Sequence, residues 1–297
     1  PQEYPIVRAW AALILLNLYR HNRKASTIDN VVLHLDSLKQ NTCHGYSGYC
    51  WGLGFKYAVS KDLIYDSNMP LSTMTPYPLE AFVTYTEISK SDAYLDVIRS
   101  IYSFFENDIQ ILEETKEYLV TSYAPLPDRK VVNAVSYSMY SLAILLPYID
   151  EMEHQRLGQK IKKLFAFIVK SQNADGSWFY SPEGHSFIDW FHTCVVLKNI
   201  IKTNRAFPLH DSDQVVAQGY LYLKNNFFLE KVGLFKRFSK SNKPSIVKSR
   251  VQELAEMLNL AILMGDGSLV GELRKAIEKN FCVGEDIYSQ IDTMGKK

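Results

Sequence analysis

The feature that most constrains the fold of this chain is a repeat of paired helical segments. Hydrophobic residues recur mainly at helical spacing, strand-like alternation is rare, and Gly and Pro gather between the helical stretches. The predicted helices form five pairs, at residues 5–21 and 26–40, 77–89 and 91–108, 131–149 and 156–172, 186–202 and 213–227, and 250–264 and 269–281. From the second pair onward they recur about every 50 to 60 residues, a period typical of repeat architectures.

The two members of each pair differ in character. First members, such as SYSMYSLAILL and WFHTCVVL, are apolar on most sides, whereas second members, such as KIKKLFAFIVK and ELRKAIEKNF, are amphipathic. This pattern predicts an all-α protein in which buried inner helices and half-exposed outer helices form an α/α toroid, an (α/α)5-6 barrel. We expect residues 1–297 to form a single domain, with residues 231–249 as a basic connection between the fourth and fifth helix pairs.

Composition narrows the class of protein. The net charge of +1 gives the chain no strong attraction to nucleic acid, so we expect no nucleic-acid partner. Four Cys in 297 residues do not make a disulfide framework, and a reducing compartment fits best. The longest apolar run, within residues 9–19, falls short of the ~20 residues of a membrane span. We expect a cytoplasmic protein, although a chain that begins at Pro1 leaves a preceding signal segment open.

The phrase QNADGSW at residues 172–178 has the features of a turn between helices. Asp175 and Gly176 supply the turn, and we expect Trp178 to pack back over the hairpin. The phrase resembles the Q-x-x-x-G-x-W repeat of squalene and hopene cyclases, which are α/α toroids. The acidic cluster of those cyclases and the zinc set of protein prenyltransferases have no counterpart here, so the resemblance supports the fold and not isoprenoid chemistry.

Read together, the loops resemble another group of proteins. The phrases GYSGYCWG (45–52), YAPLPDRKVVN (123–133), QNADGSW and FIDWFHT (187–193) occur in this order. They are similar to phrases in uncharacterised α/α-toroid proteins encoded in bacterial capsule and exopolysaccharide gene clusters. The resemblance runs from the first helix to about residue 265 and implies a role in polysaccharide production. Two positions depart from the family pattern: Lys56 replaces an acid, and Glu80 stands where Asn is common.

Inner helices of a toroid enter the ring from one side, so their first turns and preceding loops form one surface, here called the mouth. Aromatic rings stack on sugar faces, and amides and charged groups bind hydroxyls. We therefore expect an oligosaccharide or other sugar-containing substrate, anionic ones included. The predicted substrate-binding residues are His44, Tyr46, Tyr49, Trp51, Tyr123, Arg129, Asn133 and His185.

Four residues are candidates for catalysis: Asp189, His192, Glu80 and Asp128. Asp189 and His192 lie three residues apart on one helical face, where a carboxylate would orient the imidazole and raise its basicity. The structural alternative is that Asp189 caps the helix and His192 bonds a neighbouring carbonyl. Glu80 could likewise act as a cap or pair with Arg129.

Each type of reaction would use a different set of these residues. A hydrolase needs two facing carboxylates, and the candidate pairs are Glu80 with Asp189 or Asp128 with Asp189. A lyase or epimerase would remove a carbon-bound proton with His192 or a Tyr such as Tyr49. Arg129 or Asn133 would then neutralise a substrate acid. The alternative function is a non-catalytic glycan-binding or scaffold subunit of a polysaccharide assembly complex, which the Lys56 departure favours.

Two further segments have open interpretations. Cys43, His44 and Cys50 fall short of the four ligands of a structural zinc site, so we expect no metal, and no cofactor is indicated. Free buried thiols are the more common alternative. Residues 231–250 carry seven Lys or Arg and no acid. They form either a solvated linker or a contact with an anionic glycan, a phosphate group, a membrane surface or an assembly complex.

Overall fold

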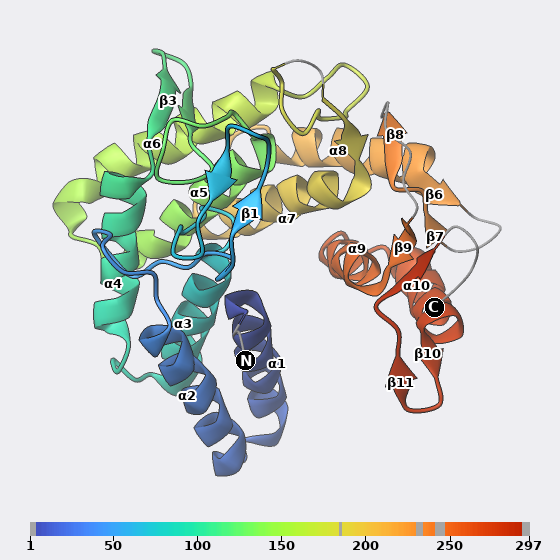
Figure 1. Cartoon of the computed structure of the whole chain (residues 1–297), viewed down its shortest axis with the longest axis horizontal. Coiled ribbons are helices and arrows are strands. Elements are labelled where there is room, and N and C mark those ends of the chain that lie inside the picture. Colours follow the sequence, from blue (N-terminus) through green and yellow to red (C-terminus); the bar gives the residue numbers. More distant parts are fainter. Residues whose placement is uncertain (1–3, 184–185, 230–233, 241–246, 293–297) are drawn as a thin grey trace. The chain divides into compact units, whose positions relative to one another are not determined.

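The computed structural model describes residues 4–183, 186–229, 234–240 and 247–292 and is mostly helical (Figure 1). The α-helices are α1 (Pro5–Asn22), α2 (Ala25–Gln40), α3 (Pro76–Ser89), α4 (Leu95–Ser103), α5 (Val132–Leu145), α6 (Glu151–Lys170), α7 (Trp190–Ala206), α8 (Ser212–Phe227), α9 (Val251–Leu263) and α10 (Gly267–Phe281). They follow the ten predicted segments. None of these described helices is long and apolar enough to cross a membrane.

Several predicted boundaries need correction. The segment expected at 91–108 starts only at Leu95 and ends in a π-helix, η1 (Phe104–Asp108). The long apolar helix of residues 131–149 tightens into a 3-10 turn, η2 (Leu146–Tyr148), because Pro147 has no N–H to continue it.

Ser26 and Asp213 are of residue types that often cap helices, but they lie inside α2 and α8. The N-caps of α2 and α8 are Lys24 and Asp211, and neither side chain accepts a capping hydrogen bond. Several polar residues adjoin each of these helix starts, so composition alone could not select the cap.

The internal contacts of the chain divide it into two compact units. Unit 1 contains residues 1–130 and 137–167, and unit 2 contains residues 131–136 and 168–297. The boundary between them crosses α5 and α6, so each of these two helices has residues in both units.

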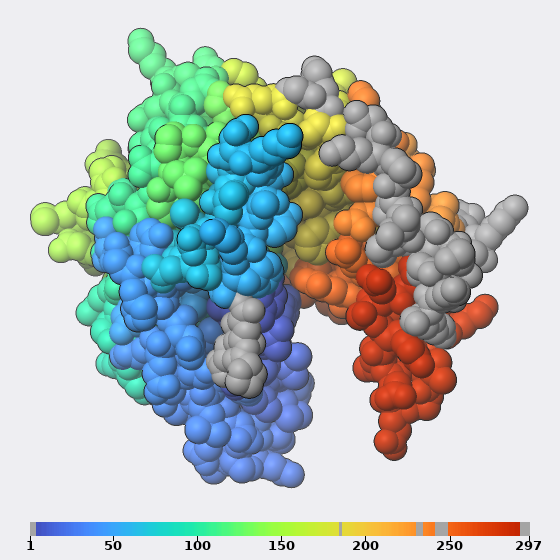
Figure 2. Space-filling view, in the orientation of Figure 1, coloured from blue at the N-terminus to red at the C-terminus, as the bar shows by residue number. Residues whose placement is uncertain are grey.

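Unit 1 contains α1–α4 and most of α5 and α6. Helix α1 packs against α2 and α3, and the core includes the fully buried Trp51, Phe82 and Phe104. Two antiparallel ribbons project from it. The strands are β1 (Tyr57–Ala58) with β2 (Ile64–Tyr65), and β3 (Ile111–Glu114) with β4 (Leu119–Thr121). The β1–β2 ribbon lies on the surface, where its light-blue atoms are visible in Figure 2.

Unit 2 contains α7–α10 and four short antiparallel ribbons among its described residues. The pairs are β5 (Ile188–Asp189) with β8 (Phe238–Lys240), β6 (Phe228–Leu229) with β7 (Leu234–Phe235), β9 (Val247–Arg250) with β12 (Gln290–Asp292), and β10 (Cys282–Val283) with β11 (Asp286–Ile287). Trp190, Phe227 and Phe281 fill the core. A buried ion pair between Lys198 and Glu256 joins α7 to α9.

The QNADGSW phrase forms the predicted turn after α6. Gly176 has a φ of 89°, in the left-handed region that favours glycine. Trp178 is 3% exposed, and its indole N–H donates to the carbonyl of Ile168 at 2.9 Å. Gln172 donates from Nε2 to the carbonyls of Gly176 and Val215, which ties the turn to α8. The structural interpretation of this phrase is confirmed.

Candidate functional site

The centre of the candidate site is the junction of β5 and α7 in unit 2. Asp189 is the N-cap of α7, and its Oδ1 accepts a hydrogen bond of 2.7 Å from the backbone N–H of His192. Its Oδ2 lies 2.6 Å from Nδ1 of the same imidazole. Asp189 therefore caps the helix, as the structural alternative held, and also orients the ring, which contacts this carboxylate and not a neighbouring carbonyl.

This contact sets the chemistry of the imidazole. A carboxylate can only accept hydrogen bonds when ionised, so Nδ1 carries the proton, and Nε2 of the neutral ring has a free lone pair. The side chain of His192 is 29% exposed, whereas Asp189 is 7% exposed. The geometry gives a partly accessible base held by a buried carboxylate.

Aromatic rings surround the imidazole. Tyr180 meets it edge-on at a centroid distance of 4.6 Å, and Phe187 lies at 6.0 Å. Tyr180 and Phe187 stack on each other at 4.8 Å. The N–H of Tyr180 donates to the carbonyl of Phe187, so the loop between α6 and α7 folds back beside His192. The site thus offers flat apolar surfaces next to a base.

The sequence analysis missed Glu253 on α9, which is 8% exposed. Burial raises the pKa of Glu253, and Asp189 adds to the rise, while Arg237, Arg250 and His192 act against it. These charges place Glu253 in the electrostatic environment of the dyad. A carboxyl whose pKa is raised by burial, in the electrostatic environment of a base, is one way to build an acid–base pair. An acidic residue in the first turn of an apolar inner helix was the signal that could have identified it.

Part of the basic segment packs against the same site. Strand β8 pairs with β5, and Phe238 lies opposite Asp189 in this register. The ring of Phe238 contacts Phe187 edge-on at 5.5 Å, and the guanidinium of Arg237 lies 5.4 Å from the Phe238 ring centre. Lys240 Nζ lies 4.8 Å from the ring centre of Phe179. A solvated linker is therefore the wrong description for residues 234–240.

A second cluster in unit 1 unites three predicted residues, Tyr123, Asp128 and Arg129. Asp128 accepts from the Tyr65 hydroxyl at 2.7 Å and from the Tyr123 backbone N–H at 3.1 Å. Tyr65 and Tyr123 stack at 5.7 Å, and Arg129 lies 5.2 Å from the Tyr123 ring centre. Burial and the Asp128 carboxylate raise the pKa of Tyr65. Both oxygens of Asp128 are thus engaged in holding this loop.

The inner helices of unit 1 carry an aromatic series that the sequence analysis also missed. Trp10 on α1, Tyr77 on α3 and Tyr137 on α5 follow one another at centroid distances of 5.8 and 5.7 Å. The hydroxyls of Tyr77 and Tyr137 are 2.5 Å apart. Burial raises the pKa of Tyr140, as does its hydrogen bond with Glu80. Trp10 and Tyr77 are half-buried, so their rings offer surface for a ligand.

The loop before β1 requires one correction. Trp51 is fully buried, and its indole N–H donates to the carbonyl of Leu38 at 2.9 Å, so no ring face is available to a sugar. Tyr46 and Tyr49 are half-buried, and the Tyr49 backbone N–H donates to Ser100 on α4. This loop therefore packs on an outer helix.

The remaining predicted residues have the following places. His44 is exposed and exchanges two hydrogen bonds with Asn68 through its backbone. Asn133 is buried at the start of α5, and its Oδ1 has no hydrogen-bond partner among the described residues. His185 lies outside the described residues. Lys56 is exposed. Hydrogen bonds from Ser67 chiefly lower the pKa of Asp66, and the charge of Lys56 adds to this lowering.

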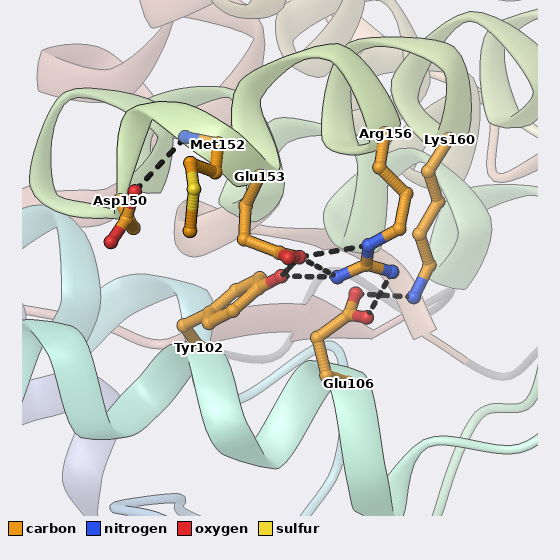
Figure 3. Close-up of polar contacts among 7 residues, drawn as sticks. All are labelled: Tyr102, Glu106, Asp150, Met152, Glu153, Arg156 and Lys160. Atoms are coloured by element: carbon orange, nitrogen blue, oxygen red, sulfur yellow. Dashed lines mark hydrogen bonds and ion pairs between the residues drawn. The ribbon is translucent and has the colours of Figure 1, made fainter.

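A cavity of about 610 Å³ in unit 1 lies outside the predicted site, between α6, η1 and the β3–β4 ribbon. Figure 3 shows the polar contacts beside it. Arg156 contacts Glu106 at 2.7 Å, Glu153 at 2.6 Å and the Tyr102 hydroxyl at 2.6 Å, and Lys160 contacts Glu106 at 2.6 Å. These cations are engaged by the chain's own acids, so the network fastens α6 to α4 and η1.

Comparisons with known proteins identify the class of fold. No protein-family model matches the chain, and no curated protein matches it. A sugar epimerase from a ruminal bacterium has a TM-score of 0.71 at 13% identity, covering 99% of this chain and 81% of that one. A cellobiose 2-epimerase from Bacillus thermoamylovorans has a TM-score of 0.71 at 12% identity, with the same coverage.

A more distant match is the unsaturated glucuronyl hydrolase of a Bacillus species. Its TM-score is 0.54 at 11% identity, covering 76% of this chain and 64% of that one. At such identities the matches establish the fold alone. The chain has an α/α-toroid fold, as its two-layer helix pattern predicted, and it shares this fold with carbohydrate-active epimerases, isomerases, hydrolases and lyases.

Proposed function

We propose that this chain is a sugar-converting enzyme of the epimerase or isomerase type. His192 removes a proton from a carbon next to a carbonyl, and Glu253 supplies a proton to the same intermediate. The observation that carries the proposal is the imidazole held by Asp189, together with the buried carboxyl of Glu253, whose raised pKa responds to the charges of both residues. The fold shared with a sugar epimerase and a cellobiose 2-epimerase supports the same class.

Hydrolysis has less support from the described contacts. A hydrolase of this fold would need two available carboxylates, and Asp128 already accepts hydrogen bonds at both oxygens. Asp189 likewise uses both oxygens on His192. The dyad and Glu253 instead provide a base and an acid, which a proton-transfer reaction requires.

The substrate is proposed to carry a negative charge. The charges of Arg237 and Arg250 work against the rise in the pKa of Glu253. Lys240 lies against the ring of Phe179 in the neighbouring aromatic loop. Such positive groups would attract a uronic acid or another acidic sugar. Within the same unit, the stacked rings of Tyr180 and Phe187 next to His192 would support the sugar by stacking.

The biological setting we propose is bacterial polysaccharide production, on the basis of the loop phrases that resemble capsule and exopolysaccharide proteins. A scaffold or glycan-binding subunit without catalysis is the second candidate, because Lys56 replaces an acid of that pattern. The basic segment could then contact an anionic glycan, a membrane surface or the assembly complex.

Product analysis separates these proposals. Neutral and acidic sugars are incubated with the protein and followed by chromatography and mass spectrometry. An epimerase or isomerase gives a product of unchanged mass, a hydrolase gives fragments that have gained water, and a lyase gives an unsaturated product. We expect an isomer from an acidic sugar, and Glu253→Gln should lower kcat by about 100-fold or more.

Two controls sharpen this test. Glu272 is an exposed acid on α10, so Glu272→Gln should leave kcat unchanged. Arg237→Gln should raise KM for acidic sugars more than for neutral ones. Binding of sugars without any product, unchanged by Glu253→Gln, would favour the scaffold function.

A further inference from the structure

Cys43 and Cys50 lie side by side at the base of the loop that carries Tyr46 and Tyr49. The backbone N–H of Cys43 donates to the carbonyl of Cys50 at 2.9 Å. Thr42 closes the other side, because its Oγ1 accepts from the Cys50 N–H and donates to the Cys50 carbonyl, both at 3.0 Å. The two cysteines are therefore neighbours in space, although six residues separate them in the sequence.

The spacing of such neighbours suits a disulfide. The backbone hydrogen bond from Cys43 to Cys50 joins two neighbouring chain segments, and segments joined in this way lie about 4.7–4.9 Å apart in the hydrogen-bonding direction. A disulfide spans Cα distances of about 4.4–6.8 Å. The two thiols also interact, since each one shifts the pKa of the other. Both thiols are free in this structure.

The two thiols differ in their suitability as nucleophiles. The hydrogen bond from Cys50 lowers the pKa of Cys43, burial opposes it, and the backbone N–H of Gly52 adds to the lowering. The contact with Cys43, together with burial, raises the pKa of Cys50. Cys43 is half-buried, whereas Cys50 is fully buried. The accessible thiol is thus the more easily ionised one, which is the pattern of an attacking and a resolving cysteine.

We infer that Cys43 and Cys50 are a redox-active pair that forms a reversible disulfide by exchange with a small-molecule disulfide such as oxidised glutathione. The Cys43 thiolate attacks one sulfur of glutathione disulfide, whose S–S bond breaks and releases one glutathione thiolate. The Cys50 thiol then loses its proton to solvent and attacks the Cys43 sulfur, releasing the second glutathione. The protein loses two electrons and two protons, and the glutathione disulfide gains them as two thiols.

The position of the pair determines which segment a disulfide would affect. The loop between the two cysteines is fixed at Ser47, whose N–H and hydroxyl bind Asp108, and at Gly48, where an added Cβ would lie 1.8 Å from the carbonyl oxygen of Ser100. Burial raises the pKa of Tyr46, and both thiols contribute to the rise, so this ring lies near the pair. Oxidation therefore acts on the loop that was expected to bind sugar.

The test is a redox titration of the full chain. The protein is equilibrated with mixtures of reduced and oxidised glutathione in which the fraction of oxidised glutathione increases. Each sample is then quenched with acid, alkylated, digested and analysed by mass spectrometry. After digestion with trypsin, both cysteines lie in one peptide, residues 40–56, and we expect an internal disulfide that makes it lighter by two hydrogens than the reduced peptide. Cys50→Ala should stop at a mixed disulfide of Cys43 with glutathione. Cys194, buried and donating to the Glu256 carbonyl, should stay reduced throughout.

A matched control is Cys282→Ser, which removes a half-buried thiol elsewhere and should leave the Cys43–Cys50 linkage unchanged. The inference is overturned if both thiols remain open to alkylation at every glutathione ratio. It is also overturned if wild-type Cys43 holds only glutathione and never transfers to Cys50. The linkage is mapped in the wild-type chain, so the result does not depend on folding of the variant.

Discussion

Asp189 performs two tasks with its two oxygens, and substitution can separate them. Asparagine is as good an N-cap as aspartate, whereas alanine is a poor one. Asp189→Asn should therefore retain the helix cap and lose the ionised partner of His192. Asp189→Ala should lose both. The contribution of the cap to stability can be measured without knowing the substrate.

We predict that Asp189→Ala lowers the free energy of unfolding by about 1 kcal/mol more than Asp189→Asn does. Urea denaturation followed by circular dichroism measures this difference. Equal loss in the two variants would show that the cap bond from the His192 N–H contributes nothing to α7.

A second residue-scale prediction concerns the close contact behind Trp178. A Cβ on Gly219 in α8 would lie 2.6 Å from the Trp178 ring and 2.8 Å from Leu197 Cδ2. Gly219→Ala should therefore destabilise the protein by about 1–3 kcal/mol. Gly271 in α10 is the matched control, because a Cβ there meets nothing within 4 Å. Gly271→Ala should raise stability by about 0.5–1 kcal/mol, and a gain at both positions would refute the packing argument.

Exposure of single residues was the least predictable property. Trp51 and Trp178 both follow a glycine-containing loop phrase, and both indoles donate to a helix carbonyl and are buried. This packing was expected for Trp178, whereas Trp51 was expected to bind a sugar. Glu253 resembles an ordinary solvated acid in sequence. Asp189, Arg237 and His192, whose charges act on the pKa of Glu253, come from other parts of the chain, which no local pattern connects to α9.

At the scale of elements, the network on α6 shows how outer helices are fastened. The Glu106 side chain is 14% exposed and contacts both Arg156 and Lys160 (Figure 3). Burial alone would raise the pKa of Glu106, but Lys160 and Arg156 outweigh it, so the net pKa is lowered. A lowered carboxyl pKa contributes stability above the unfolded value of about 4.3, and this stability is lost as pH falls through the folded pKa.

We predict that Glu106→Gln lowers the free energy of unfolding by about 1–3 kcal/mol at pH 7. The difference from wild type should shrink as the pH is lowered below about 4, where the wild-type carboxyl also becomes neutral. Glu114→Gln is the control, because Glu114 is 50% exposed in its pair with Lys163 and should contribute less than about 1 kcal/mol. A Glu106→Gln effect that is independent of pH would exclude the ion pairs as its source.

The positions of helices were predictable from hydrophobic periodicity, and their ends were less so. Helix α6 begins at Glu151, five residues before the expected start, because EMEHQ carries no apolar periodicity although it is helical. Helix α4 gives way to a π-helix at Phe104, which places Phe104 and Phe105 in the core. Such adjustments follow from packing partners that a local window does not contain.

At the scale of the whole molecule, the two-layer helix pattern correctly predicted an α/α toroid, while a single domain of residues 1–297 stays a prediction. Helices α5 and α6 have residues in both compact units. Unfolding one unit would therefore break helices that the other unit also uses. We predict one cooperative thermal transition, with equal calorimetric and van't Hoff enthalpies. Two resolved transitions would show that the units are independent domains.

The measurement that tests the central claim most directly is solvent deuterium incorporation, with acidic and neutral sugars incubated in D2O and read by NMR and mass spectrometry. We predict one deuterium at the carbon next to the carbonyl in the epimerised or isomerised product. Asp189→Asn should slow this incorporation by about 100-fold or more, although the variant stays folded. A product without deuterium, or incorporation unchanged in Asp189→Asn and His192→Asn, would contradict proton transfer by the dyad.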